Sequence, residues 1–148
     1  MADQSEKLIS GNYTTINGRV LLSVYNEKTG RRVDGSYSGM GWFNNNEARG
    51  IALFDSYTGS NINVHIWGAN GAVSRKKIKD VYRYVFDYLN CNRLTGIFPV
   101  SNKNLLQLIE RFDFVYECTM HDYFGAPEAP EDGLVYYISR EKAKKWIS

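Results

Sequence analysis

The chain carries most of its fold information in residues 62–114, which read INVHIWGANGAVSRKKIKDVYRYVFDYLNCNRLTGIFPVSNKNLLQLIERFDF. Polar and apolar side chains alternate along residues 61–67, so this segment predicts a strand. The alternation places Val64 and Ile66 on an apolar face and His65 on the opposite, polar face. One face of this strand is therefore expected to meet the core, and the other to carry polar groups.

The residues after this strand predict a helix, a strand and a second helix. Ser74 can cap a helix that runs to about Leu89, because the apolar residues in between recur at helical spacing. Residues 94–100 are short and largely apolar, which is typical of a strand buried on both faces. Ser101 and Asn102 can cap the second helix, which has an apolar stripe of its own.

The N-terminal part predicts further strands. Residues 20–25, with the sequence VLLSVY, predict a strand that ends at a turn. A hairpin follows, with arms at residues 41–43 and 50–55 and a turn at residues 44–47. Together with residues 61–67, the hairpin predicts a three-stranded antiparallel meander.

The C-terminal part predicts two strands, at residues 114–117 and 134–138, and a short helix at residues 140–147. The acidic residues 125–133 between these strands are rich in Pro and Gly, so we expect an open connection or a lid. The order of elements predicts an α/β (α+β) fold, in which helices pack on a mixed, mostly antiparallel sheet. A chain of 148 residues is most simply one domain.

Composition argues against several classes of function. The formal net charge is only +2, which favours neither nucleic acid nor an anionic membrane as a partner. Residues 1–7 lack the apolar run of a signal peptide, and no stretch approaches the ~20 apolar residues of a membrane span. Cys91 and Cys118 are expected to be free thiols in the cytoplasm. With His65 and His121 as the two histidines, no metal site is expected.

Several short sequences occur in an order and spacing that carry a family resemblance. They are GIALFDSYTG at residues 50–59, VHI at residues 64–66, VFDYLNCNRLTG at residues 85–96, Asn102 with Phe114 twelve residues later, and SRE at residues 139–141 with Trp146. In this order they resemble the GNAT (Gcn5-related N-acetyltransferase) superfamily, and most closely its ribosomal-protein-type and small phage-borne members. The resemblance covers about two thirds of the chain.

Three features depart from the family pattern. Asp113 stands where the family has a glycine before Phe114, and Ile109 stands where many members have a tyrosine. The loop of residues 68–74 matches the family's pyrophosphate-binding sequence only loosely. A non-catalytic interaction protein that kept the fold would tolerate these departures, so this alternative stays open beside an enzyme.

The resemblance implies a single GNAT-like domain that uses acetyl-CoA as its cofactor and acetylates an amine of a protein or a small molecule. Residues 41–148 would form the acetyl-CoA-binding part, and residues 1–40 a poorly matched strand and loop segment of the same domain. The residues expected to bind the cofactor are Val64, Ile66, Gly71, Ala72, Val73, Ser74, Arg75, Lys76 and Asn102.

Elementary chemistry supports two parts of this set. A strand with free backbone groups can hold the pantetheine arm, and N–H groups at a helix start can meet a pyrophosphate. Arg75, Lys76 and Lys77 could add positive charge for the phosphates, although a solvated basic helix turn explains them equally well. Asn102 could donate a hydrogen bond to cofactor or substrate, or it could be a plain helix N-cap.

The candidate catalytic residues are His65, Tyr57 and Asn102. His65 could take the proton from the acceptor ammonium, with Asp55 and Glu47 as alternative bases. A histidine in a strand is, however, more often a packed or hydrogen-bonded residue. Tyr57 or Tyr123 could protonate the departing thiolate.

The expected partner is therefore an amine acceptor, and neither nucleic acid nor a membrane is expected. A nucleic-acid-binding module is a weaker alternative, because the net charge is near neutral. It would use the tyrosines together with the basic residues Arg31, Arg32, Arg75, Lys76 and Lys77. Pairing of edge strands into a homodimer is left open.

Overall fold

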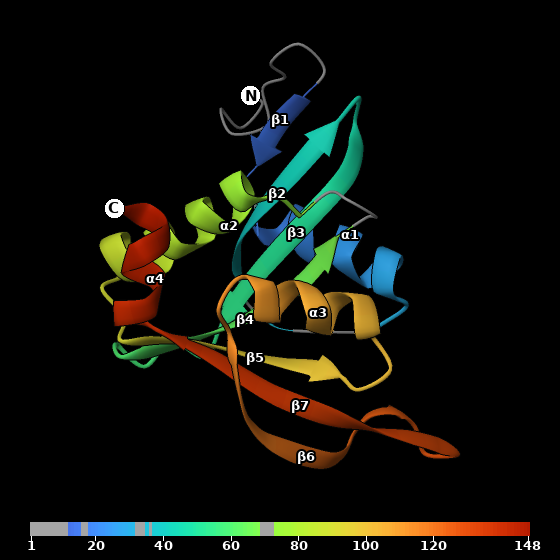
Figure 1. Cartoon of the computed structure of the whole chain (residues 1–148). Coiled ribbons are helices and arrows are strands. Elements are labelled where there is room, and N and C mark those ends of the chain that lie inside the picture. The colour runs from blue at the N-terminus through green and yellow to red at the C-terminus, as the bar shows by residue number, and fades with distance from the viewer. Residues whose placement is uncertain (1–11, 16–17, 32–34, 36, 69–72) are drawn as a thin grey trace. The chain divides into compact units, whose positions relative to one another are not determined.

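The computed structural model describes residues 12–15, 18–31, 35, 37–68 and 73–148, and Figure 1 labels its elements. The strands are β1 (Asn12–Thr15), β2 (Ser38–Asn44), β3 (Glu47–Asp55), β4 (Asn61–Gly68), β5 (Arg93–Pro99), β6 (Val115–Ala126) and β7 (Ala129–Ser139). The helices are α1 (Gly18–Thr29), α2 (Arg75–Tyr82), the π-helical η2 (Arg83–Tyr88), α3 (Lys103–Arg111) and α4 (Arg140–Ile147).

The chain folds into two compact units, which are described separately. Unit 1 comprises Met1–Ser56 and Val64–Val81, and unit 2 comprises Tyr57–Asn63 and Tyr82–Ser148. Strand β4 begins in unit 2 and continues in unit 1, while α2 lies in unit 1 up to its last residue. Both units combine antiparallel strand pairs with helices, so the predicted α/β (α+β) fold with a mostly antiparallel sheet is confirmed.

The strands of unit 1 follow the order β1-β2-β3-β4. Strand β2 is antiparallel to both β1 and β3. Gly50 near the start of β3 lies beside the Trp67 carbonyl, and Asp55 at its end lies beside His65, so β3 and β4 are antiparallel as well. The predicted three-stranded meander is therefore confirmed.

Residues 20–25 do not form the predicted strand but belong to helix α1. Leu21 and Tyr25, four residues apart, are both buried, at 0% and 1% exposure, and lie on one face of the helix. They pack with Phe43, Ile51 and Leu53 of the sheet. The strand prediction was wrong because a short, continuous apolar run has no clear period.

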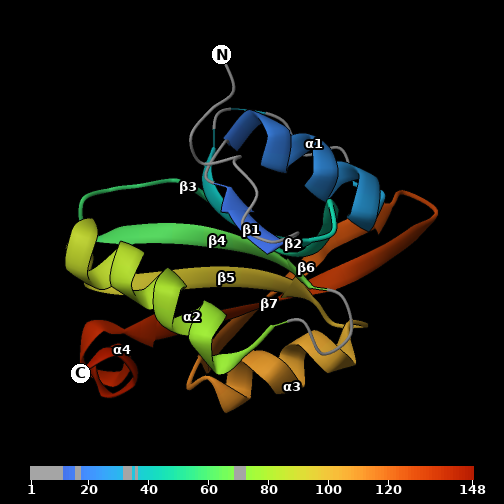
Figure 2. The ribbon, with the colours of Figure 1, turned by 90° about the horizontal axis from the view of Figure 1, so that it is seen from above.

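Helix α1 lies unusually close to strand β2 of unit 1. A Cβ at Gly41 would overlap the side chain of Leu21, and a Cβ at Gly39 would stand only 3.0 Å from it. These two glycines leave a groove that the Leu21 side chain fills. Figure 2 shows α1 on one side of the strands of unit 1 and α2 on the other.

The strands of unit 2 include the order β5-β7-β6, with β7 antiparallel to both neighbours. Strands β6 and β7 form a long hairpin, which Figure 1 shows side by side. They pair as far as Ala126 and Ala129, so residues 125–133 belong to the hairpin and not to an open connection or lid. The prediction of a lid was wrong, because strand pairing over a turn of two residues outweighed the Pro and Gly content.

The predicted helix of residues 74–89 is confirmed, but its second half is π-helical. The Leu89 N–H donates to the Tyr84 carbonyl at 2.9 Å, which is a π-type bond between residues five apart. In this widened segment Val85 and Phe86 are buried, whereas Tyr88 is exposed and stacks on Tyr84.

The departure at Asp113 has a conformational reason. Asp113 has a φ of 75°, a left-handed conformation that glycine adopts most easily and that Asp tolerates better than most residues. Its carboxylate accepts a hydrogen bond of 2.9 Å from Trp146 Nε1 of α4. The ring of Trp146 packs edge-on against Tyr82 and Phe112, so Asp113 helps to hold the C-terminal helix.

Substitution of Asp113 tests this account. Asp113→Asn keeps both the left-handed preference and an acceptor oxygen, and is expected to match the wild type. Asp113→Ala is expected to lower the free energy of unfolding by about 2 kcal/mol, through backbone strain and the lost hydrogen bond. Asp113→Gly removes only the bond and should fall between the two. Urea denaturation monitored by tryptophan fluorescence measures all three, and an Ala variant as stable as the wild type would contradict the account.

Candidate functional site

Strand β4 and the start of α2 gather most of the predicted site residues in unit 1. Val64 is buried, at 1% exposure, and Ile66 points toward α2. His65 lies on the other face of the strand, toward α1. The two-faced strand expected from the alternation is therefore present.

The His65 side chain is paired with Asp55 of the neighbouring strand β3. Its Nε2 lies 3.1 Å from Asp55 Oδ1, and each side chain is 28% exposed. Antiparallel pairing of β3 and β4 fixes this cross-strand distance. The structure thus makes Asp55 a partner of His65.

Two tyrosines enclose the His65 ring. Tyr37, just before β2, lies edge-to-face at 5.6 Å between ring centres, and Tyr25 of α1 lies at 6.3 Å. The Tyr25 hydroxyl accepts a hydrogen bond of 3.1 Å from Arg31. Burial raises the pKa of Tyr25, and the positive charge of Arg31 only partly offsets this effect.

Glu47, the other acid considered as a base, lies far from His65. It is the first residue of β3 and Asp55 is the last. At the rise of a strand, this separation is roughly 26 Å. The alternative of Glu47 acting on the same group as His65 is therefore excluded.

The predicted phosphate-binding loop is described only in part. Gly71 and Ala72 lie outside the described residues, whereas Val73 and Ser74 lie inside. Ser74 caps α2, because its hydroxyl accepts a hydrogen bond of 3.3 Å from the Lys77 N–H. Arg75 and Lys76 follow on the exposed first turn, so the helix start presents two solvent-accessible cations.

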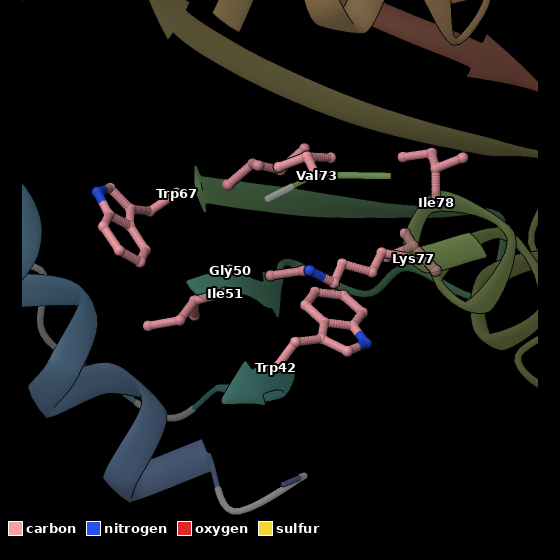
Figure 3. Close-up of a pocket in the computed structure, with 10 residues that line it drawn as sticks. Trp42, Gly50, Ile51, Trp67, Val73, Lys77 and Ile78 are labelled. Carbon is pink, nitrogen blue, oxygen red and sulfur yellow. The ribbon is translucent and has the colours of Figure 1, made fainter. Parts of the chain in front are cut away.

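Lys77 differs from these two cations because its side chain enters an apolar pocket. The pocket lies in unit 1 between α2 and the strands, and Figure 3 shows the Lys77 side chain passing the indole of Trp42. Ile66, Val73 and Ile78 complete much of its wall, and Lys77 is the one charged residue among the ten that line it. Burial, followed by the nearby charge of Arg49, lowers the pKa of Lys77.

Tyr57 and Asn102 belong to unit 2, apart from the residues above. The Tyr57 side chain is 54% exposed, and its hydroxyl donates a long hydrogen bond of 3.4 Å to the Leu89 carbonyl. The Asn102 side chain accepts a hydrogen bond of 3.3 Å from the Leu105 N–H and thereby caps α3. Tyr123 lies exposed on β6, against the ring of Phe124.

The sequence alone did not indicate that Tyr25 and Tyr37 flank His65. For Tyr25 a signal was present, because Leu21 and Tyr25 stand four residues apart and such a pair marks one face of a helix. For Tyr37 there was no such signal, because it lies in a segment without periodic pattern.

Neither a metal-binding cluster nor a membrane-spanning helix is found among the residues that the structure describes. Within the described ranges, no three His, Cys, Asp or Glu side chains come close enough together to hold a metal ion. None of the helices in those ranges is long and apolar enough to cross a membrane. Cys91 and Cys118 are free thiols, the first buried and the second exposed.

Comparison with known proteins shows a shared fold. The sequence matches no protein-family model and none of the curated proteins. A variant of the spermidine N-acetyltransferase SpeG from Vibrio cholerae has a TM-score of 0.69 and 16% identity, over 91% of this chain and 97% of that one. YncA from Salmonella typhimurium, assigned as an acetyltransferase and solved with its cofactor acetyl-CoA, has a TM-score of 0.68 and 12% identity, over 88% and 94%. A further structure assigned as an acetyltransferase has a TM-score of 0.73 and 11% identity, over 99% and 92%.

At these identities the likeness concerns the fold. The structural neighbours are named as acetyltransferases and share this fold, which confirms the expected fold class. The particular likeness to ribosomal-protein-type and phage-borne members stays a prediction.

The lowered pKa of Lys77 makes a chemical prediction. Trace acetylation with acetic anhydride, followed by mass spectrometry at a series of pH values, should show Lys77 becoming reactive at a lower pH than the same residue in the urea-unfolded chain. Arg49→Gln should move this midpoint partly back up, because it removes the lesser of the two causes. A midpoint equal to that of the unfolded chain would refute the buried position of the amine.

Proposed function

We propose that this protein is an N-acetyltransferase that transfers the acetyl group of acetyl-CoA to an amine. The observation that carries the proposal is the Asp55-paired His65 on β4, in a chain with the fold of acetyltransferases. The acetyltransferase YncA, a neighbour at a TM-score of 0.68, was solved with acetyl-CoA, which supports the choice of cofactor. The acceptor would be an amine of a protein or of a small molecule.

The residues at the start of α2 fit the charge of this cofactor. Eight-residue helix α2 presents N–H groups at its N-terminus, where a diphosphate is stabilised. Arg75 and Lys76 add exposed positive charge. A Cβ at Gly68 would overlap the Val73 side chain, so Gly68 at the end of β4 lies against Val73. In the proposal Val64 and Ile66 bind the pantetheine arm through their backbone groups, and Gly71, Ala72, Val73 and Ser74 contribute N–H groups to the diphosphate.

His65 is the proposed general base. Acetyl-CoA supplies an activated thioester. The acceptor ammonium gives one proton to His65, and the resulting neutral amine forms the C–N bond as the C–S bond breaks. The electron pair of that bond would leave with the thiolate. Tyr57 is the proposed donor of the one proton that the thiolate takes, and it would regain a proton from the second N–H of the amine through solvent. Asn102 is the proposed hydrogen-bond donor to cofactor or substrate.

Residues 1–40 are proposed to complete the acceptor side of the same domain. Helix α1 supports this role, because its Tyr25 packs against the His65 ring. The closer relationship to ribosomal-protein-type and phage-borne enzymes and a cytoplasmic location are proposed from the sequence. A homodimer is proposed through β6, a strand of 12 residues at the end of the strand order with Val115, Tyr116, Met120 and Tyr123 exposed.

A non-catalytic interaction protein with the same fold is the second candidate. It is favoured by Asn102, whose side chain already caps a helix, and by the exposed apolar residues of β6. The two candidates differ in whether the protein binds the cofactor.

Calorimetric titration of the whole protein decides between them. We expect micromolar binding of acetyl-CoA, and weaker binding of the 3′-dephospho analogue if the exposed cations contact phosphate. Arg75→Gln together with Lys76→Gln should reduce the affinity about tenfold, because two phosphate contacts are removed. Absence of binding at millimolar cofactor would support the interaction protein.

Substitution of His65 tests the proposed base. His65→Ala is expected to lower turnover at neutral pH by about 10²- to 10⁴-fold and to leave acetyl-CoA affinity nearly unchanged. The measurement is release of free CoA thiol with a panel of amines, alongside calorimetry. His121→Ala, which replaces the exposed histidine of β6, serves as control. Unchanged turnover in His65→Ala would remove His65 from the mechanism.

A further inference from the structure

The Asp55 carboxylate lies within hydrogen-bond distance of one nitrogen of the His65 ring. Its Oδ1 lies 3.1 Å from His65 Nε2, and both side chains are held at the end of one strand and the middle of the next. Within the described residues, no hydrogen bond to His65 Nδ1 is found, and 28% of the side chain is exposed. One ring nitrogen is therefore occupied by Asp55, and no described residue forms a hydrogen bond with the other.

An ionised carboxylate can accept but not donate a hydrogen bond. Facing such a group, Nε2 must carry the hydrogen, and in a neutral imidazole Nδ1 then holds the lone pair. The edge-to-face rings of Tyr37 and Tyr25 limit rotation of the imidazole away from this position. The atom able to take a proton is thereby fixed as Nδ1.

We propose that Asp55 is a positioning residue, which locks His65 in the Nε2–H tautomer so that Nδ1 accepts the proton of the acceptor amine. This inference rests on the proposed acetyltransferase function. After the proton transfer both ring nitrogens carry hydrogen, and the Asp55 carboxylate stabilises the imidazolium through its charge. The proton then leaves from Nδ1 to solvent, which restores the starting tautomer.

Other charged and titratable groups of unit 1 face the same surface. From α1 these are Tyr25 and Lys28, whose ammonium lies 5.8 Å from the ring centre of Trp67, two residues beyond His65. Arg31 binds the Tyr25 hydroxyl, and the Tyr37 ring lies edge-to-face to the imidazole. Among these groups, Asp55 is the one whose side chain lies within hydrogen-bond distance of the His65 ring.

The tautomer is tested first, without any ligand. Long-range ¹H–¹⁵N spectra of the full chain should show His65 as the Nε2–H form at a pH above its titration. The chain has two histidines, so His121→Gln assigns the signals. Asp55→Ala should give a mixture of both forms. A wild-type His65 that is predominantly Nδ1–H would overturn the proposal.

Kinetics test the positioning role. Asp55→Asn and Asp55→Ala are expected to lower kcat by about 10- to 100-fold, with the KM for acetyl-CoA unchanged. The pH–rate profile of each variant is recorded beside that of the wild type. Asp55→Glu should recover part of the rate. In a His65→Ala background, Asp55→Asn should have no further effect, since the two residues act as a unit.

The matched control is Asp87→Asn, the same chemical change at an exposed position of η2. If Asp55→Asn matches this control in kcat and pH profile while His65→Ala lowers turnover, the positioning role is overturned and the proposed base remains. If the protein does not bind acetyl-CoA at all, the proposed function fails. That outcome is recognised by calorimetry and is distinct from either result for Asp55.

Discussion

The close packing of Leu21 of α1 on Gly39 and Gly41 of β2 is the contact on which much of unit 1 depends. Side chains at the two strand positions would hold the helix away from the sheet. Without them, Leu21 becomes fully buried, which contributes about 2 kcal/mol. The same helix brings Tyr25, one turn later, against the ring of His65, so the geometry of the candidate base follows from a packing requirement in the core.

Strand β4 separates two different environments within unit 1. On the α2 side lie Val64, Ile66 and an apolar pocket, in which Lys77 is the charged lining residue. On the α1 side lies His65, with a carboxylate and two aromatic rings around it. The strand thereby separates the apolar surface near the start of α2, which Lys77 borders, from the hydrogen-bonded His65.

Local sequence patterns were sufficient to predict an element where the residue types at its positions favour a single conformation. Alternation predicted β4, and the hairpin turn predicted β2 and β3. The capping residues Ser74 and Asn102 mark the starts of α2 and α3 in both sequence and structure. Asp113 shows the limit of the same reasoning. It stands where the family has a glycine, and its φ is 75°. Its hydrogen bond to Trp146, however, joins residues 33 positions apart. Spacing alone contains no information about such a contact.

From residue 41 onward, the sequence by itself determined the order of the elements. It also determined the two faces of β4 and the presence of a histidine on the polar face, because these follow from side-chain period and caps. Only the tertiary structure decided that residues 20–25 are helical. A short apolar run can form a strand or a helix, and the helix is the conformation that buries both Leu21 and Tyr25 in unit 1. It also decided that Asp55, and not Glu47, meets His65. The pairing of β3 with β4 brings Asp55 next to His65, whereas Glu47 lies at the opposite end of β3. The partial burial of the Lys77 side chain was likewise decided by the tertiary structure, because only folding brings the residues that line its pocket together.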